Sequence, residues 1–139
     1  MGMFNIFNIT GSGMSAQSVR LNATASNLAN AETVSSSTGE TYRARHPMFS
    51  TALNEAMGGD GAATGGVRVD GIVESQAPLQ RKFAPDHPKA DENGYIYMPN
   101  VNPVEEMANM MSASRSYQTQ VEVANTAKQL MMKTLTLGK

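Results

Sequence analysis

Two histidines are the side chains in this sequence best suited to general-base catalysis or metal binding. His46 and His87 each precede a proline, and neither has a clustered glutamate, a cysteine or a second histidine beside it. Because a proline pushes the residue before it out of helical geometry, a His-Pro pair more simply shapes an extended loop. The pattern therefore predicts that neither histidine is a catalytic base or a metal ligand.

Three other patterns invite a chemical interpretation and fail to support one. The acidic segment Asp86–Gly94 lacks the ligand order of an EF-hand, so we expect its carboxylates to form Asx-type turns. The serine of Gly11–Gly13 is not in a nucleophile elbow, and we interpret this segment as a flexible lead-in to a helix. Methionine thioethers bind copper, but the 11 methionines, five of them between Met107 and Met132, follow a helical spacing typical of packing. We expect no catalytic, cofactor-binding or metal-binding residue, hence no enzyme and no small-molecule substrate.

Composition excludes further classes of function. Charged residues make up only 17% of the 139 residues, against roughly 25% in ordinary soluble domains, and the net charge of −1 gives no field that would attract nucleic acid. Cysteine is absent, which excludes disulfides and thiolate metal sites. The first 14 residues have no basic region followed by an unbroken apolar core, so we expect no cleaved signal peptide, and no apolar run is long enough to span a membrane.

Both ends of the chain have the spacing of long helices. Apolar and small residues alternate at intervals of four and three at Met14, Ser18, Leu21, Ala25 and Leu28, which predicts a helix that begins within residues 4–14 and ends near Asn30 or Ala31. A second helix is predicted from Asn102, its N-cap, through Pro103 and the acidic first turn, to Gly138. Its stripe comprises Met107, Met110, Ser114, Tyr117, Val121, Ala124, Lys128, Met131 and Leu135.

The middle of the chain differs from both ends. Residues 67–75 and 94–101 read as strands, the segment between them as a hairpin or an extended loop, and residues 58–66 as a flexible glycine-rich stretch. The predicted fold is mainly α, with long N- and C-terminal helices paired as a coiled coil and a small β-hairpin and extended-loop middle region. The expected divisions are 1–33, 34–101 and 102–139.

The N-terminal helix carries too little charge for a helix surrounded by water. Arg20 is the only charged side chain in residues 1–31. A single antiparallel partner would bury one side of the helix only. We therefore expect neighbouring subunits to cover its uncharged flank, including Ala23, Ser26 and Asn27.

These segments also resemble a known family. "SAQSVRLNATASNLANAET" resembles the flagellar rod, hook and hook-associated proteins, and "YRARHP", "GIVES", "HPKADENGY", "PNVNPVEEMANM" and "SASRSYQ" narrow the resemblance to proteins of the proximal rod. It covers nearly the whole chain apart from residues 58–66. Phe83 departs from the family pattern, in which tyrosine is expected.

The resemblance implies a structural subunit that joins the MS ring and the flagellar export gate to the distal rod and transmits torque. It implies export by the flagellar type III apparatus without cleavage, a periplasmic place in the basal body, and termini that are poorly ordered before assembly. The implied neighbours are further copies of the chain, the rod proteins FlgB and FlgF and the adaptor FliE.

Two alternatives remain open at this point: a distal rod or hook-type subunit, which would usually have a larger middle domain, and a soluble helical-hairpin binding protein, which would need a charged outer face. The residues expected to pack between helices or subunits are Met14, Leu21, Ala25, Asn27, Leu28, Asn30, Met107, Met110, Tyr117, Val121, Ala124, Met131 and Leu135.

Overall fold

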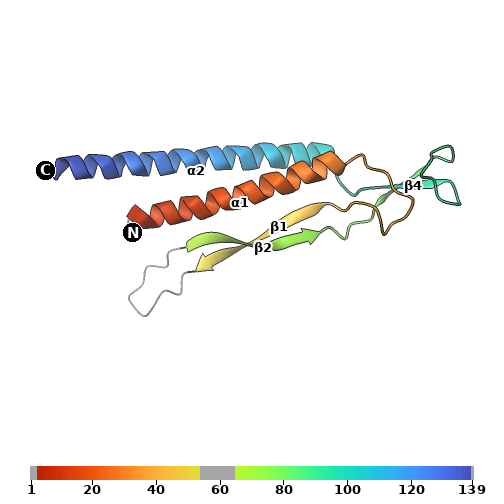
Figure 1. Ribbon diagram of the computed structural model, residues 1–139, viewed down its shortest axis with the longest axis horizontal. Helices are drawn as coiled ribbons and strands as arrows, with labels where there is room; N and C mark the ends of the chain where they lie inside the picture. The colour runs from red at the N-terminus through yellow and green to blue at the C-terminus, as the bar shows by residue number, and fades with distance from the viewer. Residues whose placement is uncertain (1–2, 54–64, 139) are drawn as a thin grey trace.

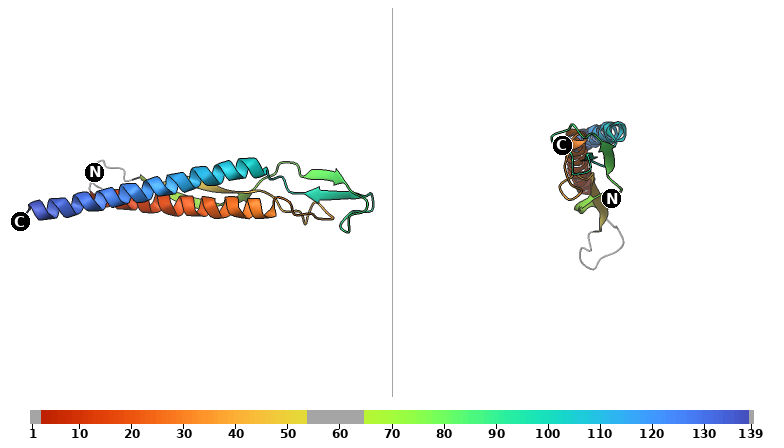
Figure 2. Two further views of the ribbon diagram at one scale, coloured as in Figure 1. Left: turned by 90° about the horizontal axis from the view of Figure 1, so that it is seen from above. Right: turned by 90° about the vertical axis from the view of Figure 1, so that its right-hand side faces the viewer.

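The computed structural model describes residues 3–53 and 65–138 and shows an elongated molecule with two long helices and two small antiparallel sheets (Figures 1 and 2). The elements in chain order are α1 (Met3–Asn30), β1 (Arg45–Leu53), β2 (Gly65–Glu74), β3 (Gln80–Phe83), β4 (Tyr95–Met98) and α2 (Pro103–Leu137). The predicted arrangement of one helix at each end and a small strand region between them is confirmed.

The start of α2 follows the predicted capping pattern. Asn102 has extended backbone angles, and its side-chain oxygen accepts a hydrogen bond from the backbone N–H of Val104 at 3.1 Å. Pro103 is the first helical residue, where its missing N–H costs nothing, and Glu105 and Glu106 lie at the positive end of the helix dipole. Helix α2 runs for 35 residues and ends immediately before Gly138.

The two helices lie antiparallel and pack closely. A Cβ added to Gly13 would lie 2.5 Å from Nε2 of Gln120, and the Asn27 side chain contacts Glu106 at the other end of the pair. Between these points the guanidinium of Arg20 donates to Oδ1 of Asn109 at 3.2 Å. The glycine therefore leaves room for the Gln120 side chain against the backbone of α1.

The buried face of α2 differs from the predicted stripe. The buried residues of this helix are Glu106, Ala113 and Ala127, whereas Met107, Ser114 and Lys128 were predicted, each one residue later in the chain. Met107 is 52% exposed, and Lys128 is also exposed. The prediction followed the larger apolar side chains, but a close approach between helices selects the smaller ones, so the face toward α1 is turned by about one residue.

The hairpin of β1 and β2 covers α1 on the side away from α2 (Figure 1). Ser12 makes the contact, because its hydroxyl accepts a hydrogen bond from the backbone N–H of Val67 at 3.2 Å. A Cβ on Gly66 would lie only 3.0 Å from that hydroxyl oxygen. The interpretation of Gly11–Gly13 as a flexible lead-in is wrong, since the segment is helical and its small residues admit the hairpin on one side and α2 on the other.

The hairpin also changes the interpretation of the uncharged flank of α1. Ala23 is 6% exposed and Asn27 is fully buried within this one chain, and Ser26 is half-buried. The expectation that neighbouring subunits cover Ala23 and Asn27 is therefore wrong, because the chain's own elements bury them. An uncharged exposed strip remains on another face of α1, formed by Ser15, Ser18, Asn22, Ala25 and Ala29.

The middle region has more strand than its sequence indicated. The segments predicted over 67–75 and 94–101 correspond to β2 and to the shorter β4, while β1 and β3 were not predicted as strands. His46 and Pro47 lie in β1, paired with Val73 and Ile72, rather than in a loop. Pro47 is tolerated because each strand of a two-stranded sheet is an edge strand. Residues 58–64 of the predicted glycine-rich stretch lie outside the described residues, and Gly65 and Gly66 begin β2.

The turn between β3 and β4 uses its acidic residue as expected. Oδ1 of Asp91 accepts hydrogen bonds from the backbone N–H groups of Tyr95 at 2.8 Å and Asn93 at 2.9 Å. The N–H of Tyr95, more than that of Asn93, lowers the pKa of the Asp91 carboxyl below its usual 3.8. Gly94 follows with φ of 77°, a conformation that favours glycine. The predicted Asx-type turn is confirmed.

Candidate functional site

Within residues 3–53 and 65–138, the side chain with the most hydrogen bonds is the amide of Asn27, near the end of α1. Its Nδ2 donates to the backbone carbonyl of Arg45 at 2.9 Å and to Oε2 of Glu106 at 3.1 Å. Its Oδ1 accepts from the backbone N–H of Arg45 at 2.8 Å and from the hydroxyl of Tyr42 at 2.9 Å. All four hydrogen-bonding positions of the amide are used. We call this set, Asn27, Tyr42, Arg45 and Glu106, the joint, because it ties α1 to α2 and to the start of β1.

Glu106 is the charged member of the joint and is only 4% exposed. Among the described residues no cation forms an ion pair with it, and its side-chain partner is the amide of Asn27. A buried carboxylate costs free energy unless hydrogen bonds replace its water. The position near the N-terminus of α2 supplies a second favourable term, since the helix dipole is positive there.

Tyr42 packs the joint against the small apolar core of the molecule. Its ring lies against the buried cluster of Ala31, Ala44 and Val101. This cluster lies just after the end of α1 and just before the start of α2. The guanidinium of Arg45 lies 5.4 Å from the centre of the same ring, within the range of a cation–π contact. The Tyr42 hydroxyl also lies 3.2 Å from Oγ of Ser26. One aromatic side chain thus connects the polar joint to the apolar core.

A second asparagine fixes the segment that leads into α2. Oδ1 of Asn100 accepts from the backbone N–H of Ala44 at 2.8 Å, and its Nδ2 donates to the carbonyls of Ser75 and Ala77 at 3.2 and 2.9 Å. Arg43 donates to the same two carbonyls. The backbone on both sides of the joint is therefore held by side-chain hydrogen bonds rather than by a large apolar core.

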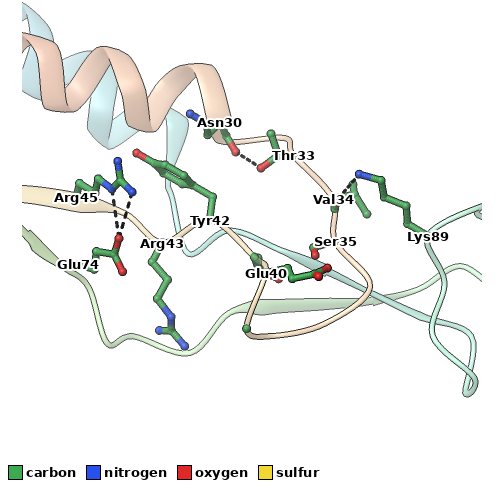
Figure 3. A pocket seen from close by; sticks show the side chains of 12 residues that line it. Asn30, Thr33, Val34, Ser35, Glu40, Tyr42, Arg43, Arg45, Glu74 and Lys89 are labelled. Atoms are coloured by element: carbon green, nitrogen blue, oxygen red, sulfur yellow. Dashed lines mark hydrogen bonds and ion pairs between the residues drawn. The ribbon is translucent and has the colours of Figure 1, made fainter.

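A surface cavity of about 570 Å³ lies beside the joint (Figure 3). Its basic side chains are engaged within the chain: Arg45 pairs with Glu74 at 3.3 Å, and Nζ of Lys89 donates to the carbonyl of Val34 at 3.1 Å. The third, Arg43, donates to the carbonyls described above. Arg45 is paired with a carboxylate, and Arg43 and Lys89 have donors engaged by backbone carbonyls, so none of the three is held in the cavity solely for an anionic ligand.

The residues first considered for chemistry have no part in the hydrogen bonds of the joint, although His46 directly follows Arg45. His46 is exposed on β1, and Nδ1 of His87 accepts the backbone N–H of Lys89 at 3.1 Å, a local turn contact. Within residues 3–53 and 65–138, no three His, Cys, Asp or Glu side chains are grouped to hold a metal ion. Neither helix in the described part of the chain is long and apolar enough to cross a membrane.

Comparison with known proteins gives the geometry a context. Residues 7–34 match the family described as "Flagella basal body rod protein", and residues 92–137 match "Flagellar basal body rod FlgEFG protein C-terminal". Over the full length of both chains, the protein is 52% identical to flagellar basal-body rod protein FlgC of Salmonella typhimurium and 55% identical to FlgC of Escherichia coli O6:H1. It is 36% identical to FlgC of Bacillus subtilis, again over the full length of both chains.

The chain belongs to the flagellar basal-body rod protein family. This is a family of structural proteins and not of enzymes. The two matched segments contain the two terminal helices almost entirely, and Asn27 and Glu106 lie one in each of them. Tyr42 and Arg45 lie between the matched segments. In this rod-family protein, the joint therefore connects the two family segments through the middle region.

Sequence reasoning included part of the joint and missed the rest. Asn27 and Asn30 were among the expected packing residues, and Asn30 is half-buried with its Nδ2 donating to the carbonyl of Ser26 at 2.8 Å. Tyr42, Arg45 and Glu106 were not. The sequence indicated only that Glu106 is an acidic residue in the first turn of α2. One feature could have predicted its burial: the N-terminal helix is uncharged and rich in asparagine, and asparagine amides can donate to a carboxylate at the start of the helix packed against it.

The structure distributes the other expected packing residues over two environments. Ala25, Met107, Tyr117 and Leu135 are exposed in the single chain, the last three at 52%, 38% and 65% respectively. The half-buried members are Met14, Leu21, Leu28, Met110, Val121, Ala124 and Met131. Contacts within the chain thus partly bury the half-buried residues. The four exposed residues face solvent in the single chain and are available for contact with another subunit.

Proposed function

We propose that the protein is a structural, self-assembling subunit of the proximal rod of the bacterial flagellar basal body. It helps to connect the MS ring and the export gate to the distal rod and transmits torque. The observation that carries this proposal is the full-length identity of 52–55% to relatives named as basal-body rod protein FlgC. An elongated chain whose helices are fastened to a hairpin is suited to bear load along its axis.

The surface of the single chain supports assembly. On α1 the exposed strip of Ser15, Ser18, Asn22, Ala25 and Ala29 has no charge, although a helix face in water normally carries several. On α2 several large apolar side chains are exposed, among them Val104 at 75% and Met111 at 70%. Exposed apolar groups gathered on one element mark contacts with other proteins. The expected packing residues that are exposed here, Ala25, Met107, Tyr117 and Leu135, are proposed to contact neighbouring subunits.

The finer features of the assembly form part of the same proposal. Residues 1–33 and 102–139 would form the inner layer of the rod as paired helices that supercoil as a coiled coil, and residues 34–101 would lie outside them. The neighbours would be further copies of the chain, the rod proteins FlgB and FlgF, the adaptor FliE, the MS ring and the export apparatus. The subunit would reach the periplasmic rod by flagellar type III export, without a cleaved signal peptide.

Complementation tests this function. A flagellated bacterium that lacks its own copy of this rod protein is given the gene, and swimming and the composition of purified basal bodies are measured. We expect swimming to return and the chain to be present in the basal bodies. The absence of a stable, exported chain from those basal bodies would contradict the proposal.

A matched pair of variants tests the uncharged strip. Ala25 and Ala77 are both exposed in the single chain, so lysine at either position should change the free energy of unfolding of the purified chain by no more than about 0.5 kcal/mol. In the rod, Ala25→Lys would bury an unpaired charge and abolish incorporation, whereas Ala77→Lys on the loop before β3 should be incorporated. Equal incorporation of both variants would show that the strip faces solvent in the rod.

A further inference from the structure

The turn between β3 and β4 contains an asparagine that is directly followed by glycine. Of the 11 asparagines in the sequence, only Asn93 precedes a glycine, Gly94. Asparagine is a chemically labile residue, because the peptide nitrogen of the next residue can attack its side-chain amide. A glycine in that next position leaves the attacking nitrogen unshielded and the backbone free to reach the required geometry. Asn93 is therefore the asparagine of this sequence whose side chain is most open to such an attack.

The fold requires the glycine of this pair. Gly94 has a φ of 77°, and a Cβ at this position would lie 3.0 Å from Cε2 of Phe83 and 3.2 Å from Cβ of Pro85. The carbonyl of Gly94 accepts the backbone N–H of Ala84 at 2.9 Å, which ties the turn to the residue after β3. Any side chain at position 94 would strain the closed turn.

The fold makes no comparable demand for asparagine at position 93. The Asn93 side chain is exposed, and in the part of the chain that the structure describes its amide has no hydrogen-bond partner. The turn uses the backbone N–H of this residue instead, which donates to Oδ1 of Asp91 at 2.9 Å. The reactive amide is thus open to solvent, and its loss would remove no contact that holds the turn.

The closed turn engages the nitrogen that would attack. The N–H of Gly94 donates to the backbone carbonyl of Asp91 at 3.0 Å, and the N–H of Tyr95 donates to Oδ1 of the same residue at 2.8 Å. The rings of Phe83 and Tyr95 pack edge to face, with their centres 5.2 Å apart, across the same end of the hairpin. Attack requires the Gly94 nitrogen to lose its proton and to approach Cγ of Asn93, which breaks the bond to Asp91. The reaction therefore proceeds from an opened turn.

We propose that Asn93 is a site of spontaneous deamidation, which the folded β3–β4 turn protects and an unfolded chain exposes. The Gly94 nitrogen forms a bond to Cγ of Asn93, the side-chain nitrogen leaves as ammonia, and a cyclic imide results. Water then breaks one of the two ring bonds to the Gly94 nitrogen. Cleavage at Cγ gives aspartate, and cleavage at the main-chain carbonyl carbon gives isoaspartate. Neither step needs an enzyme, a metal or an oxidant.

The isoaspartate product would alter the hairpin. Its main chain passes through the side-chain carbons, so an extra CH₂ group separates the N–H of residue 93 from that of Tyr95. These two N–H groups share Oδ1 of Asp91 in the closed turn and would no longer fit the same oxygen. The hairpin also pairs with the segment after α1, because the backbone N–H of Tyr97 donates to the carbonyl of Ser35 at 3.0 Å. A chain modified while unfolded would therefore close this hairpin less well.

Peptide mass spectrometry of the full-length purified chain tests the site. Trypsin cuts after Lys89 and Arg115, so one fragment contains Asn93 and three internal controls, Asn100, Asn102 and Asn109. The chain is incubated in mildly alkaline buffer with and without denaturing guanidinium, and conversion at each asparagine is followed over time. In the denaturant we expect Asn93 to convert about tenfold faster than each control, because only Asn93 is followed by glycine. Without denaturant it should convert about tenfold more slowly than with it, which corresponds to about 1.4 kcal/mol for opening the turn.

Matched variants test the protection. Asp91→Ala removes the acceptor of two turn N–H groups, so the rate without denaturant should rise toward the denatured rate. Asp86→Ala makes the same change of charge at an exposed residue of the same connection and should leave that rate unchanged. Asn93→Gln keeps the backbone N–H but has a longer side chain, which disfavours ring closure. It should remove the fast conversion and leave the thermal unfolding midpoint of the fresh chain unchanged.

The consequence is measured on refolded protein. After incubation in the denaturant and refolding, the wild-type chain should contain a less stable fraction enriched in isoaspartate, and Asn93→Gln treated in the same way should not. Conversion at Asn93 no faster than at the three internal controls would overturn the site. Equal rates with and without denaturant would overturn the protection by the turn. These measurements need only the purified chain, so a negative result would leave the rod function standing.

Discussion

Replacing Asn27 by alanine removes every hydrogen bond that the joint makes through its central amide. Three of the four bonds are with neutral groups, each worth about 0.5–1.5 kcal/mol net, and the fourth is with the carboxylate of Glu106, worth about 1.5–3 kcal/mol. Alanine returns roughly 0.6 kcal/mol through its higher helix propensity. We therefore expect a loss of about 2–7 kcal/mol in the free energy of unfolding, a large fraction of the roughly 5–15 kcal/mol that stabilises a typical domain.

Chemical denaturation of the purified chain, followed by circular dichroism, measures this loss. Asn22→Ala is the matched control, because Asn22 lies on the same helix and is exposed. That change should stabilise the chain by up to roughly 0.6 kcal/mol, the same gain in helix propensity. A loss below about 1 kcal/mol for Asn27→Ala, or equal effects of the two changes, would refute the idea that the amide holds the three elements together.

A second substitution separates the contribution of the carboxylate. Glu106→Gln keeps an acceptor for Nδ2 of Asn27 and removes the buried charge, so we expect a change of no more than about 1 kcal/mol. The pair Asn27→Ala with Glu106→Ala should cost clearly less than the sum of the two single alanine changes, since removing both partners leaves no stranded charge. Additive losses would show that the two side chains are energetically independent.

The glycines of α1 and the turn at Asp91 give the remaining predictions. Gly11→Ala should stabilise the purified chain by up to about 1 kcal/mol, because nothing lies within 4 Å of the added Cβ. Gly13→Val should destabilise it, because the added groups meet the side chain of Gln120, and thermal unfolding of both variants distinguishes the sites. The N–H of Tyr95 lowers the pKa of Asp91 in the folded chain. The ionised carboxylate therefore stabilises the fold above pH 3.8, and this stabilisation is lost as the pH falls through the pKa that Asp91 has in the folded chain. NMR titration of the Asp91 carboxyl should give a midpoint below 3.8, and a midpoint at or above it would contradict the turn.

The sequence by itself determined the two terminal helices and the start of α2. Asn102, Pro103 and the following acids act within a single helical turn, so local chemistry fixes that boundary. The Asx turn at Asp91 is local in the same sense, because its donors lie two and four residues further along the chain. The family could also be identified from short motifs, without any knowledge of packing.

Only the tertiary structure decided which face of each helix is buried. Glu106, rather than Met107, faces α1 because Asn27 satisfies its carboxylate, and that partner lies 79 residues away in the chain. Similarly, Ser12 and Gly13 are packing residues only because β2 and α2 contact α1 from two sides: Ser12 faces β2, and Gly13 faces Gln120 of α2. Hydrophobic periodicity selects the larger apolar residues of one helix. Close helix packing and long-range hydrogen bonds depend instead on the side chains of the element packed against that helix. The physical reason for the difference is that burial is a property of pairs of elements and not of one element's sequence.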